Sequence, residues 1–384
     1  MQPTLRILHV FGYFRPDFTG EGLYLEKLAL QLDHLGFQND VIVANTRAPS
    51  RCDPSGPIGQ IHYFGDSVRT PRRLNRAMTA WFAGHVRHYD VVHFHTAADR
   101  FFLLHAIARL AGCHIVQSST LDDGLGSTVL GYRPLYRPLV RRLCRLIDAV
   151  VGISPKLYQD SLAVLPPSRV HLIPQGVVVP PVDLAAREAE RARRGFTADD
   201  FVLLFVGGIC RRKDVMFLVE NHLKLAATCK RLRLVLVGPD LEDDYADALR
   251  RMVAASPCAA EIMLVGYLED PSMVYRAADA FVFASREEGF GNVLLEAMAF
   301  GLPVVSRRLP GVTDSFVEHG RTGFLFDTSE EYCAAVRDLV RLPAVREEVG
   351  AAARRSVVAS FDLGAIAARY AALYRRVANH RRNG

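Results

Sequence analysis

The chain has 384 residues, of which 50% are hydrophobic and 23% charged, so its composition excludes a disordered or fibrous protein. Its length predicts two domains, and it has no uninterrupted apolar stretch of about 18 residues to cross a membrane. The net charge of +6 favours an anionic partner. Scattered cysteines without metal-ligand spacing, and an N-terminus unlike a signal peptide, predict a cytoplasmic protein.

Short runs rich in valine, isoleucine and leucine alternate with helical patterns along the chain. Such runs are typical of parallel strands that are covered on both faces. The predicted fold class is therefore α/β, with two Rossmann-like, doubly wound parallel sheets. The predicted strands span residues 5–10, 40–45, 89–95, 113–119 and 148–154, and then 201–207, 232–238, 261–266, 279–285 and 303–306.

The first predicted helix and the domain boundary are both marked by local signals. Tyr24, Leu28, Leu32 and Leu35 form one helical stripe, which Gly36 ends. The segment IPQGVVVPP, followed by a highly charged run, is typical of a linker. We therefore expect domains at 1–180 and 181–384. The amphipathic segment from about residue 365 to 384 fits either of them.

The most informative stretch is EEGFGNVLLEAMAFG, in which seven residues separate Glu288 from Glu296. It follows a predicted strand and reads as a glycine loop and a helix, with Asn292 as N-cap and Gly301 as stop. Free amides and the helix dipole favour a phosphate at such a helix start. The two carboxylates add acceptors for sugar hydroxyls. This stretch predicts a nucleotide-sugar site.

Two histidines end a predicted strand in the first half. Alternation along a strand directs His93 and His95 to the same face. Two histidines without a third ligand are a weak metal signal, so we expect no metal here. Core histidines bonded to the backbone are the competing interpretation.

Two basic stretches suggest contact with a membrane surface. In residues 133–147, leucines alternate with arginines at helical spacing, which separates an apolar face from a basic one. A second stretch, residues 68–82, carries Arg69, Arg72, Arg73, Arg76 and Trp81. An ordinary basic surface explains both equally well. We expect no nucleic acid, because aromatic residues do not alternate with the arginines. The arginines expected to meet anionic lipid are Arg133, Arg137, Arg141, Arg142 and Arg145.

The whole chain resembles the GT-B glycosyltransferases, specifically glycosyltransferase family 4. The similar motifs are YFRPDFTGEGLYLEKLALQLDHLGF, YDVVHFHTA, IPQGV, FVGGICRRKD, LVGYLED, YRAADAFVFAS, EEGFGNVLLEAMAFG and EHGRTGFLF, in that order. The resemblance implies two domains that face a central cleft. It also implies a donor site in the second domain and an acceptor site in the first.

The resemblance also implies individual roles. His95, Lys213 and Glu288 would be catalytic: His95 contacts the donor or reaction centre, Lys213 neutralises the diphosphate, and Glu288 binds sugar hydroxyls. Ser119 and Thr120 would contact the acceptor. The donor-binding set would be Gly20, Gly208, Arg212, Lys213, Val265, Gly266, Tyr267, Leu268, Glu288, Gly289, Phe290, Gly291, Asn292, Val293, Leu295 and Glu296.

Some positions depart from the family pattern. Gly208 stands where members usually have an arginine that holds the diphosphate, and Arg211 or Arg212 would substitute for it. Thr19, Val178 and the run Ser118 to Thr120 also differ. The acidic cluster from Asp240 to Asp244 reads as a helix start, so we expect metal-independent catalysis without a cofactor.

The sequence thus predicts a retaining glycosyltransferase that uses a nucleoside-diphosphate sugar. Its setting would be polysaccharide, lipid-linked glycan or glycoconjugate synthesis, on the inner face of a membrane. A sugar-nucleotide epimerase and a non-catalytic partner subunit remain alternatives. A dehydrogenase is disfavoured, because HVFGYFRPDFTGEG does not match the dinucleotide spacing.

Overall fold

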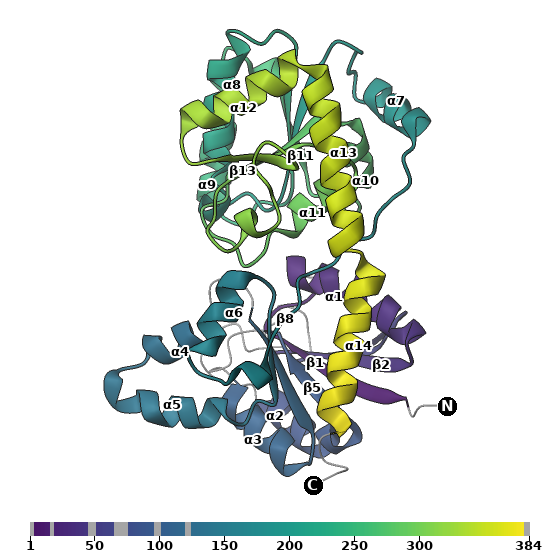
Figure 1. Ribbon diagram of the computed structural model, residues 1–384, viewed down its shortest axis with the longest axis vertical. Coiled ribbons are helices and arrows are strands. Elements are labelled where there is room, and N and C mark those ends of the chain that lie inside the picture. The colour runs from purple at the N-terminus through teal and green to yellow at the C-terminus, as the bar shows by residue number, and fades with distance from the viewer. Residues whose placement is uncertain are drawn as a thin grey trace. The chain divides into compact units, whose positions relative to one another are not determined.

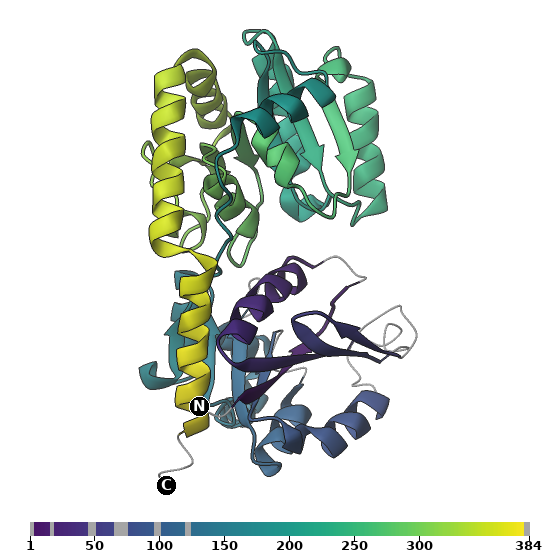
Figure 2. The same ribbon diagram turned by 90° about the vertical axis from the view of Figure 1, so that its right-hand side faces the viewer.

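The computed structural model describes residues 4–15, 19–44, 51–64, 76–95, 101–119 and 124–379. The chain divides into two compact units (Figures 1 and 2). The first comprises residues 1–176 and 363–384, and the second comprises residues 177–362. The division lies near the expected boundary at 180, and the last helix groups with the first unit. Within the described residues, no helix is long and apolar enough to span a membrane.

The first unit is built on an eight-stranded sheet. All neighbouring strands pair in parallel except the edge strand β3, which is antiparallel to β4. The chain builds outward from β1 to β2 and β4, and then from β5 towards β8 on the other side. The order is β3 (Arg51–Ser55), β4 (Ile58–Tyr63), β2 (Phe37–Val43), β1 (Leu5–Phe11), β5 (Val91–Phe94), β6 (His114–Ser119), β7 (Ala149–Gly152) and β8 (Val170–Leu172).

Helices cover this sheet, and their buried faces are the apolar stripes of the sequence. In α1, Tyr24, Leu28 and Leu32 are buried as predicted, whereas Leu35 lies just beyond the helix and is 37% exposed. Gly36 takes the positive φ of 85° that ends the helix. The helices are α1 (Gly20–His34), α2 (Arg76–His85), α3 (Phe102–Leu110), α4 (Leu125–Gly131), α5 (Arg137–Cys144), α6 (Pro155–Leu162) and α14 (Leu363–Asn379).

The second unit holds a six-stranded, fully parallel sheet. Its strands are near-continuous apolar runs because helices cover both faces. Here too the order reverses, between β9 and β12. The order is β11 (Ile262–Gly266), β10 (Leu232–Val237), β9 (Phe201–Val206), β12 (Ala280–Phe283), β13 (Val304–Arg307) and β14 (Gly323–Phe326).

The helices of the second unit complete a separate core. Phe205, Leu218, Val282 and Tyr332 are among its buried residues. The helices are α7 (Leu184–Arg193), α8 (Val215–Ala226), α9 (Asp243–Ala254), α10 (Ser272–Ala277), α11 (Asn292–Ala299), α12 (Ser329–Arg341) and α13 (Pro343–Ser360). Two doubly wound sheets of this kind confirm the predicted fold class.

Each sheet has one point at which the strand order reverses. Open parallel sheets bind ligands outside the carboxyl ends of the strands at such a point. It lies between β1 and β5 in the first unit and between β9 and β12 in the second. The strand that carries His93, β5, ends at the first of these points. The loop that carries Glu288 follows β12 at the second.

Candidate active site

The segments predicted to hold the donor follow adjacent strands of the second sheet. Lys213 ends the short 3-10 helix Arg211–Lys213, which follows β9. Glu288 lies in the loop after β12, the strand that pairs with β9. The two residues therefore flank the point where the strand order reverses, although 75 positions separate them in the sequence.

Lys213 and Glu288 form a buried ion pair. Glu288 Oε1 also lies 3.0 Å from an Arg212 guanidinium nitrogen, which donates to the carbonyl of Glu287 at 2.7 Å. Burial opposes ionisation of Glu288, but the charges of Lys213 and Arg212 outweigh it and lower its pKa. The carboxylate is thus held ionised between two cations.

The loop ends in a helix start that no side chain caps. Gly291, at φ 103°, is the N-cap of α11, so the prediction of Asn292 as N-cap was wrong: it is the first helical residue. A left-handed backbone is needed here, and glycine adopts it without strain. The buried Oδ1 of Asn292 has no hydrogen-bond partner among the described residues. These groups leave a polar, anion-favouring helix start.

Glu296 and the segment 265–268, both predicted to bind the donor, lie in α11 and at the end of β11 (Ile262–Gly266). Glu296 is in the second turn of α11, and Tyr275 donates a 3.1 Å hydrogen bond to its Oε2. Gly266, at φ 79°, ends β11, and Tyr267 after it is 51% exposed. The segment 265–268 therefore ends a strand that is two positions from β9.

The structure explains the glycine at position 208. A Cβ there would lie 2.2 Å from Cδ1 of Leu241. The neighbouring Gly238 leaves no room at all, because its Cβ would lie 1.9 Å from the Gly207 carbonyl oxygen. In this chain Leu241, from the connection between β10 and α9, thus occupies the place into which an arginine at position 208 would project. Arg212, which donates to the Glu287 carbonyl and pairs with Glu288, is a second cation at the glutamate loop beside Lys213.

Sequence reasoning missed the residues that hold the Lys213 turn in place. Asp214 adopts a left-handed conformation at φ 50°. It accepts hydrogen bonds from Arg286 at 2.8 Å and Arg307 at 2.9 Å, so the β9, β12 and β13 connections are tied together. Its position directly after Lys213 was the only available signal. The bonds constrain the backbone that carries Lys213.

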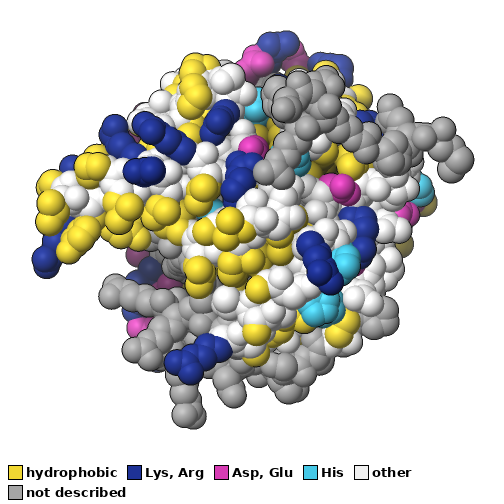
Figure 3. All heavy atoms as spheres, turned by 90° about the horizontal axis from the view of Figure 1, so that it is seen from below, with side chains coloured by type: hydrophobic (Ala, Val, Ile, Leu, Met, Phe, Trp, Pro, Cys, Tyr) yellow, Lys and Arg dark blue, Asp and Glu magenta, His cyan; other side chains and the backbone are white. Residues whose placement is uncertain are grey.

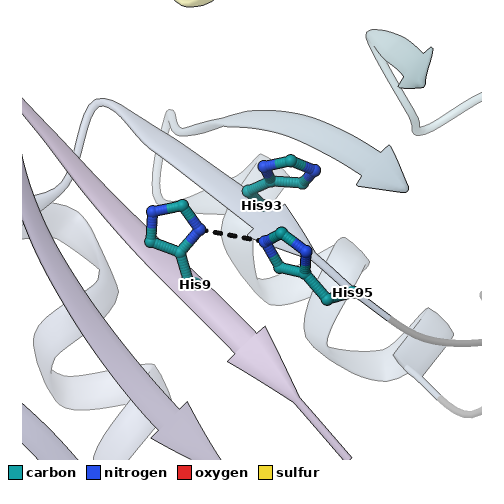
Figure 4. A group of neighbouring side chains, drawn as sticks. All are labelled: His9, His93 and His95. Atoms are coloured by element: carbon teal, nitrogen blue, oxygen red, sulfur yellow. Dashed lines mark hydrogen bonds between the residues drawn. The ribbon is translucent and has the colours of Figure 1, made fainter. Parts of the chain in front are cut away.

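At the reversal point of the first sheet, three histidines form a buried cluster (Figure 4). His9 of β1 pairs with His93 of β5, and His95 follows β5 on the same side. His9 Nδ1 lies 2.9 Å from His95 Nε2. Burial lowers the pKa of His9 and of His95 to about 3, and His95 also contributes to the lowering at His9. At neutral pH both rings are uncharged.

Each ring of the cluster is bonded on both sides. His95 Nδ1 lies 3.0 Å from Glu21 Oε1, and His9 Nε2 lies 3.1 Å from Asn39 Oδ1. His93 bonds the hydroxyls of Tyr374 and Ser118, each at 2.7 Å. A sugar that bonds a ring nitrogen of His95 would have to displace one of these partners.

The cluster is also the one group of potential metal ligands found among the described residues, with ligand atoms within 4.8 Å of one another. Three histidines are a common ligand set for zinc. Here, however, both nitrogens of His93 are already bonded to hydroxyls. The expected absence of a metal therefore stays a prediction.

The other predicted residues of the first unit lie beside this cluster, elsewhere in the unit, or outside the described residues. Gly20 begins α1, where Thr19 caps the helix by accepting from the Gly22 amide at 3.0 Å. Ser119 is buried at the end of β6. Thr120 lies outside the described residues, as do Arg69, Arg72 and Arg73. Trp81 is partly buried and stacks on His85, so it belongs to the packing of the first unit.

Comparison with known proteins supports this arrangement. The model described as Glycosyltransferase Family 4 matches residues 18–179, and the one described as Glycosyl transferases group 1 matches residues 200–341. A D-inositol 3-phosphate glycosyltransferase of Pseudarthrobacter chlorophenolicus is 34% identical over 88% of this chain and 86% of its own. The enzyme of the same name from Kineococcus radiotolerans is 29% identical over 95% and 92%.

Among solved structures, Anabaena HepE in complex with UDP-glucose covers 97% of this chain and 100% of its own, with a TM-score of 0.77 and 18% identity. Two doubly wound sheets of this kind are the GT-B architecture, which solved glycosyltransferase structures share. The chain belongs to glycosyltransferase family 4, the group 1 glycosyl transferases.

Proposed function

We propose that this enzyme is a retaining glycosyltransferase whose donor is a nucleoside-diphosphate sugar. The observation that carries the proposal is the meeting of Lys213 and Arg212 with Glu288 beside the uncapped start of α11. Breaking the bond between the anomeric carbon and the phosphate oxygen places negative charge on the diphosphate. Fixed cations and helix amides stabilise such charge as it develops.

The proposed reaction needs no side-chain nucleophile. The acceptor oxygen attacks the anomeric carbon on the face that the diphosphate leaves, and the leaving phosphate oxygen takes the acceptor's proton. Lys213 and Arg212 bind the diphosphate. Glu288 accepts hydrogen bonds from the sugar hydroxyls, and Glu296 accepts them from the ribose. The HepE complex makes a UDP-sugar the first donor to test.

We extend the proposal to metal-independent transfer. The acids from Asp240 to Asp244 are the cluster most like a diphosphate-metal site. Arg211 pairs with Glu242 and Asp244, and Arg250 pairs with Asp240. The cluster thus serves as an ion-pair network at the start of α9. Transfer is expected to continue in EDTA.

The test of the reaction compares two variants with two matched controls. Lys213→Ala and Glu288→Ala are each expected to lower sugar transfer by about 100-fold or more, since each removes a group that meets developing charge or orients the sugar. Lys230→Ala and Glu347→Ala alter exposed residues of the same unit and are expected to transfer normally. Donors to screen are UDP-, GDP-, ADP- and dTDP-sugars, with inositol phosphate, polysaccharide and lipid-linked acceptors.

The outcome also separates the alternatives. Full transfer by both Lys213→Ala and Glu288→Ala would contradict the assigned roles. An epimerase would convert the sugar nucleotide without an acceptor. A non-catalytic subunit would neither transfer nor hydrolyse any donor that it binds.

We also propose that the first unit rests on an anionic membrane through α4, the turn Pro134–Tyr136 and α5. The buried side of α5 consists of Val140 and Cys144, so the leucines at 135 and 139 do not face the core. Leu135 is 82% exposed and Leu139 57%. Hydrophobic and basic side chains gather on the part of the first unit that extends to the left in Figure 3, where Figure 1 labels α4 and α5. An apolar edge beside arginines is what an interfacial helix presents to anionic lipid.

The arginines of this surface do not all have the same task. Arg133, Arg141, Arg142 and Arg145 are exposed. Arg137 instead donates to the carbonyls of Tyr132 and Leu130, at 3.0 and 2.9 Å, and so caps the end of α4. We therefore assign lipid contact to the four exposed arginines and a structural role to Arg137.

Vesicle sedimentation tests the surface. Binding to vesicles with anionic lipid is expected to fall in Leu135→Ser/Leu139→Ser and in Arg141→Glu/Arg142→Glu. Leu184→Ser, which alters a leucine that is 68% exposed in the second unit, is the matched control and is expected to bind normally. Equal binding by all variants, or equal binding to neutral vesicles, would contradict the proposal.

A further inference from the structure

The histidine cluster carries an inference about Asn39, His9 and Glu21, residues to which the sequence assigned no role. They form one line with His95: Asn39, His9, His95 and Glu21, joined by contacts of 3.1, 2.9 and 3.0 Å. The side chain of Glu21 is 18% exposed and that of His95 7%, whereas His9 is fully buried and Asn39 is 1% exposed. The line therefore runs outward from the core to Glu21, the most exposed of the four side chains.

The ends of the line fix the direction of its hydrogen bonds. Glu21 lies in the first turn of α1, where the helix dipole favours the anion, and an ionised carboxylate only accepts. His95 must then donate from Nδ1. Because a neutral imidazole carries one N–H, its Nε2 must accept from His9 Nδ1. His9 Nε2 is left with a lone pair, so Asn39 must donate to it.

Asn39 can supply this donor if its side-chain amide turns over. Its Oδ1 is turned to His9 Nε2, and its Nδ2 donates to the Phe37 carbonyl at a long 3.4 Å. If His9 donates from Nδ1 to His95, its Nε2 carries a lone pair, and in that orientation this lone pair faces the Asn39 oxygen, which is also an acceptor. A half-turn of the amide brings Nδ2 to His9 and replaces the long bond by a contact between Oδ1 and the Phe37 carbonyl oxygen, and such turns are assigned from the hydrogen-bond network.

We propose that Asn39, His9 and His95 form a one-directional chain of donors that positions Glu21 as the hydrogen-bond acceptor for the hydroxyl of the acceptor substrate. Asn39, His9 and His95 are positioning residues in this scheme, and Glu21 is the residue that touches the substrate. The inference rests on the proposed function for the identity of the hydroxyl, whereas the direction of the hydrogen-bond chain follows from the contacts together with the neutral state of both rings.

The position of Glu21 suits this role. It follows Gly20 at the start of α1, which comes after β1, one of the two strands at the reversal point where parallel sheets bind ligands. An anion accepts hydrogen bonds from hydroxyls more strongly than a neutral group does. Because His95 uses one oxygen of the carboxylate and fixes its orientation, the substrate hydroxyl meets an acceptor that is already placed.

The first experiment reads the chain without any assay of activity. Nitrogen-15 NMR of histidine side chains in the full-length protein at pH 7 should show His9 and His95 both neutral and both protonated at Nδ1. A ring protonated only at Nε2, or a charged ring, would overturn the chain. So would stoichiometric zinc binding that shifts both signals, because zinc would then join His9 Nδ1 and His95 Nε2.

A substitution sharpens this reading. Asn39→Asp places a second carboxylate at the inner end of the line. Each of the three contacts, from position 39 to His9, from His9 to His95 and from His95 to Glu21, then needs a ring N–H, but two neutral rings carry only two. The ring pair is therefore expected to take up a proton and titrate near neutral pH, and the stability that this proton adds is lost as the pH rises through the new pKa. Rings that stay neutral in Asn39→Asp would contradict the chain. The other titratable groups around the rings are Tyr24 on α1, Asp40 on β2, His93 on β5, and Tyr370 and Tyr374 on α14.

Kinetics test the role of Glu21. Glu21→Gln keeps an oxygen for His95 but removes the charge, so the KM for the acceptor is expected to rise about tenfold or more, with the KM for the donor unchanged. Glu26→Gln, which alters an acid of the same helix paired with Arg15, is the control. If the wild type transfers sugar and Glu21→Gln leaves the acceptor KM unchanged, Glu21 has no such role. If the wild type transfers to no acceptor, the proposed function and this role of Glu21 are both contradicted. The NMR result then still tests the direction of the hydrogen bonds by itself.

Discussion

At the residue scale, the pair of Lys213 and Glu288 joins the stability of the second unit to its chemistry. Both side chains are largely removed from water, with 12% and 8% of their surface exposed. Removing one partner of such a pair leaves an uncompensated buried charge, which costs about 3–5 kcal/mol. The residues that bind the diphosphate in our proposal thus also stabilise the loop that holds them.

A double-mutant cycle checks this link. Lys213→Met and Glu288→Gln are each expected to destabilise the protein by about 3–5 kcal/mol, and the double variant by less than the sum, because it leaves neither member of the pair buried without the other. Urea unfolding followed by circular dichroism gives the three values. The exposed pair of Arg308 and Asp327 is the control, with an expected coupling below about 1 kcal/mol. Additive effects at Lys213 and Glu288 would show that the pair contributes nothing.

The same pair predicts a dependence on pH. Because its neighbours lower the pKa of Glu288, its ionised form stabilises the fold above the ordinary carboxyl pKa. This contribution is lost as the pH falls through the lowered pKa. The difference in Tm between the wild type and Glu288→Gln should therefore be largest near pH 7 and shrink in acid. A difference that is constant from pH 7 to pH 3 would rule out the pairing as its cause.

Gly208 offers a test of the missing family arginine. Leu241 blocks the space beside it, but Leu241 is 48% exposed and can be replaced. Gly208→Arg combined with Leu241→Ala is expected to bind UDP about five- to tenfold more tightly than the wild type, since a further cation reaches the diphosphate. Gly208→Arg alone should gain less. Calorimetry measures both, and weaker binding by the double variant would show that the arginine does not reach the diphosphate.

The sequence predicted single site residues better than it predicted the hydrogen-bond networks that connect them. Lys213, Glu288 and His95 were predicted from motifs, and the structure places each at a strand end by a reversal point. His9 went unnoticed because its partner lies 86 residues away, and Tyr374, bonded to His93, lies 281 residues away. Such contacts depend on strand order, which local patterns do not contain.

At the element scale, long apolar runs in the sequence identified strands, and strands without such a run were missed. Every predicted strand is present. The missed strands are β3, which contains Pro54, β4, the three-residue β8, and β14, whose residues were read as part of a glycine motif. Three of them, β3, β8 and β14, are edge strands, and β4 lies next to an edge, where strands are often short and lack the continuous Val/Ile/Leu signal of a buried strand.

The start of α11 yields a prediction about this element. Gly291 holds φ at 103°, and a Cβ there would lie 3.3 Å from Leu294 Cδ1. Gly291→Ala is therefore expected to destabilise the protein by about 1–2 kcal/mol. Gly84→Ala is the control: Gly84 lies within α2 with open space around it, so alanine should stabilise by up to about 1 kcal/mol. Urea unfolding measures both, and a neutral Gly291→Ala would show that the left-handed backbone is not needed.

At the scale of the whole molecule, the first unit is assembled from two separate pieces of chain. Helix α14 follows the entire second unit in sequence, yet it packs on α1 and β5 and supplies Tyr374 to His93. Most of one face of α14 is buried in the first unit, including Ile366, Tyr370 and Leu373. The first unit is therefore complete only when α14 is present.

Deletion of residues 363–384 is accordingly expected to unfold the first unit and leave the second folded. Burying one large apolar side chain contributes about 1.5–3 kcal/mol, so the loss of a whole buried face exceeds the usual stability of a domain. Trp81, the single tryptophan, lies in the first unit and reports on it alone. Fragment 177–362 should fold by itself, with a cooperative transition by circular dichroism. Native Trp81 fluorescence in fragment 1–362 would show instead that the first unit does not need α14.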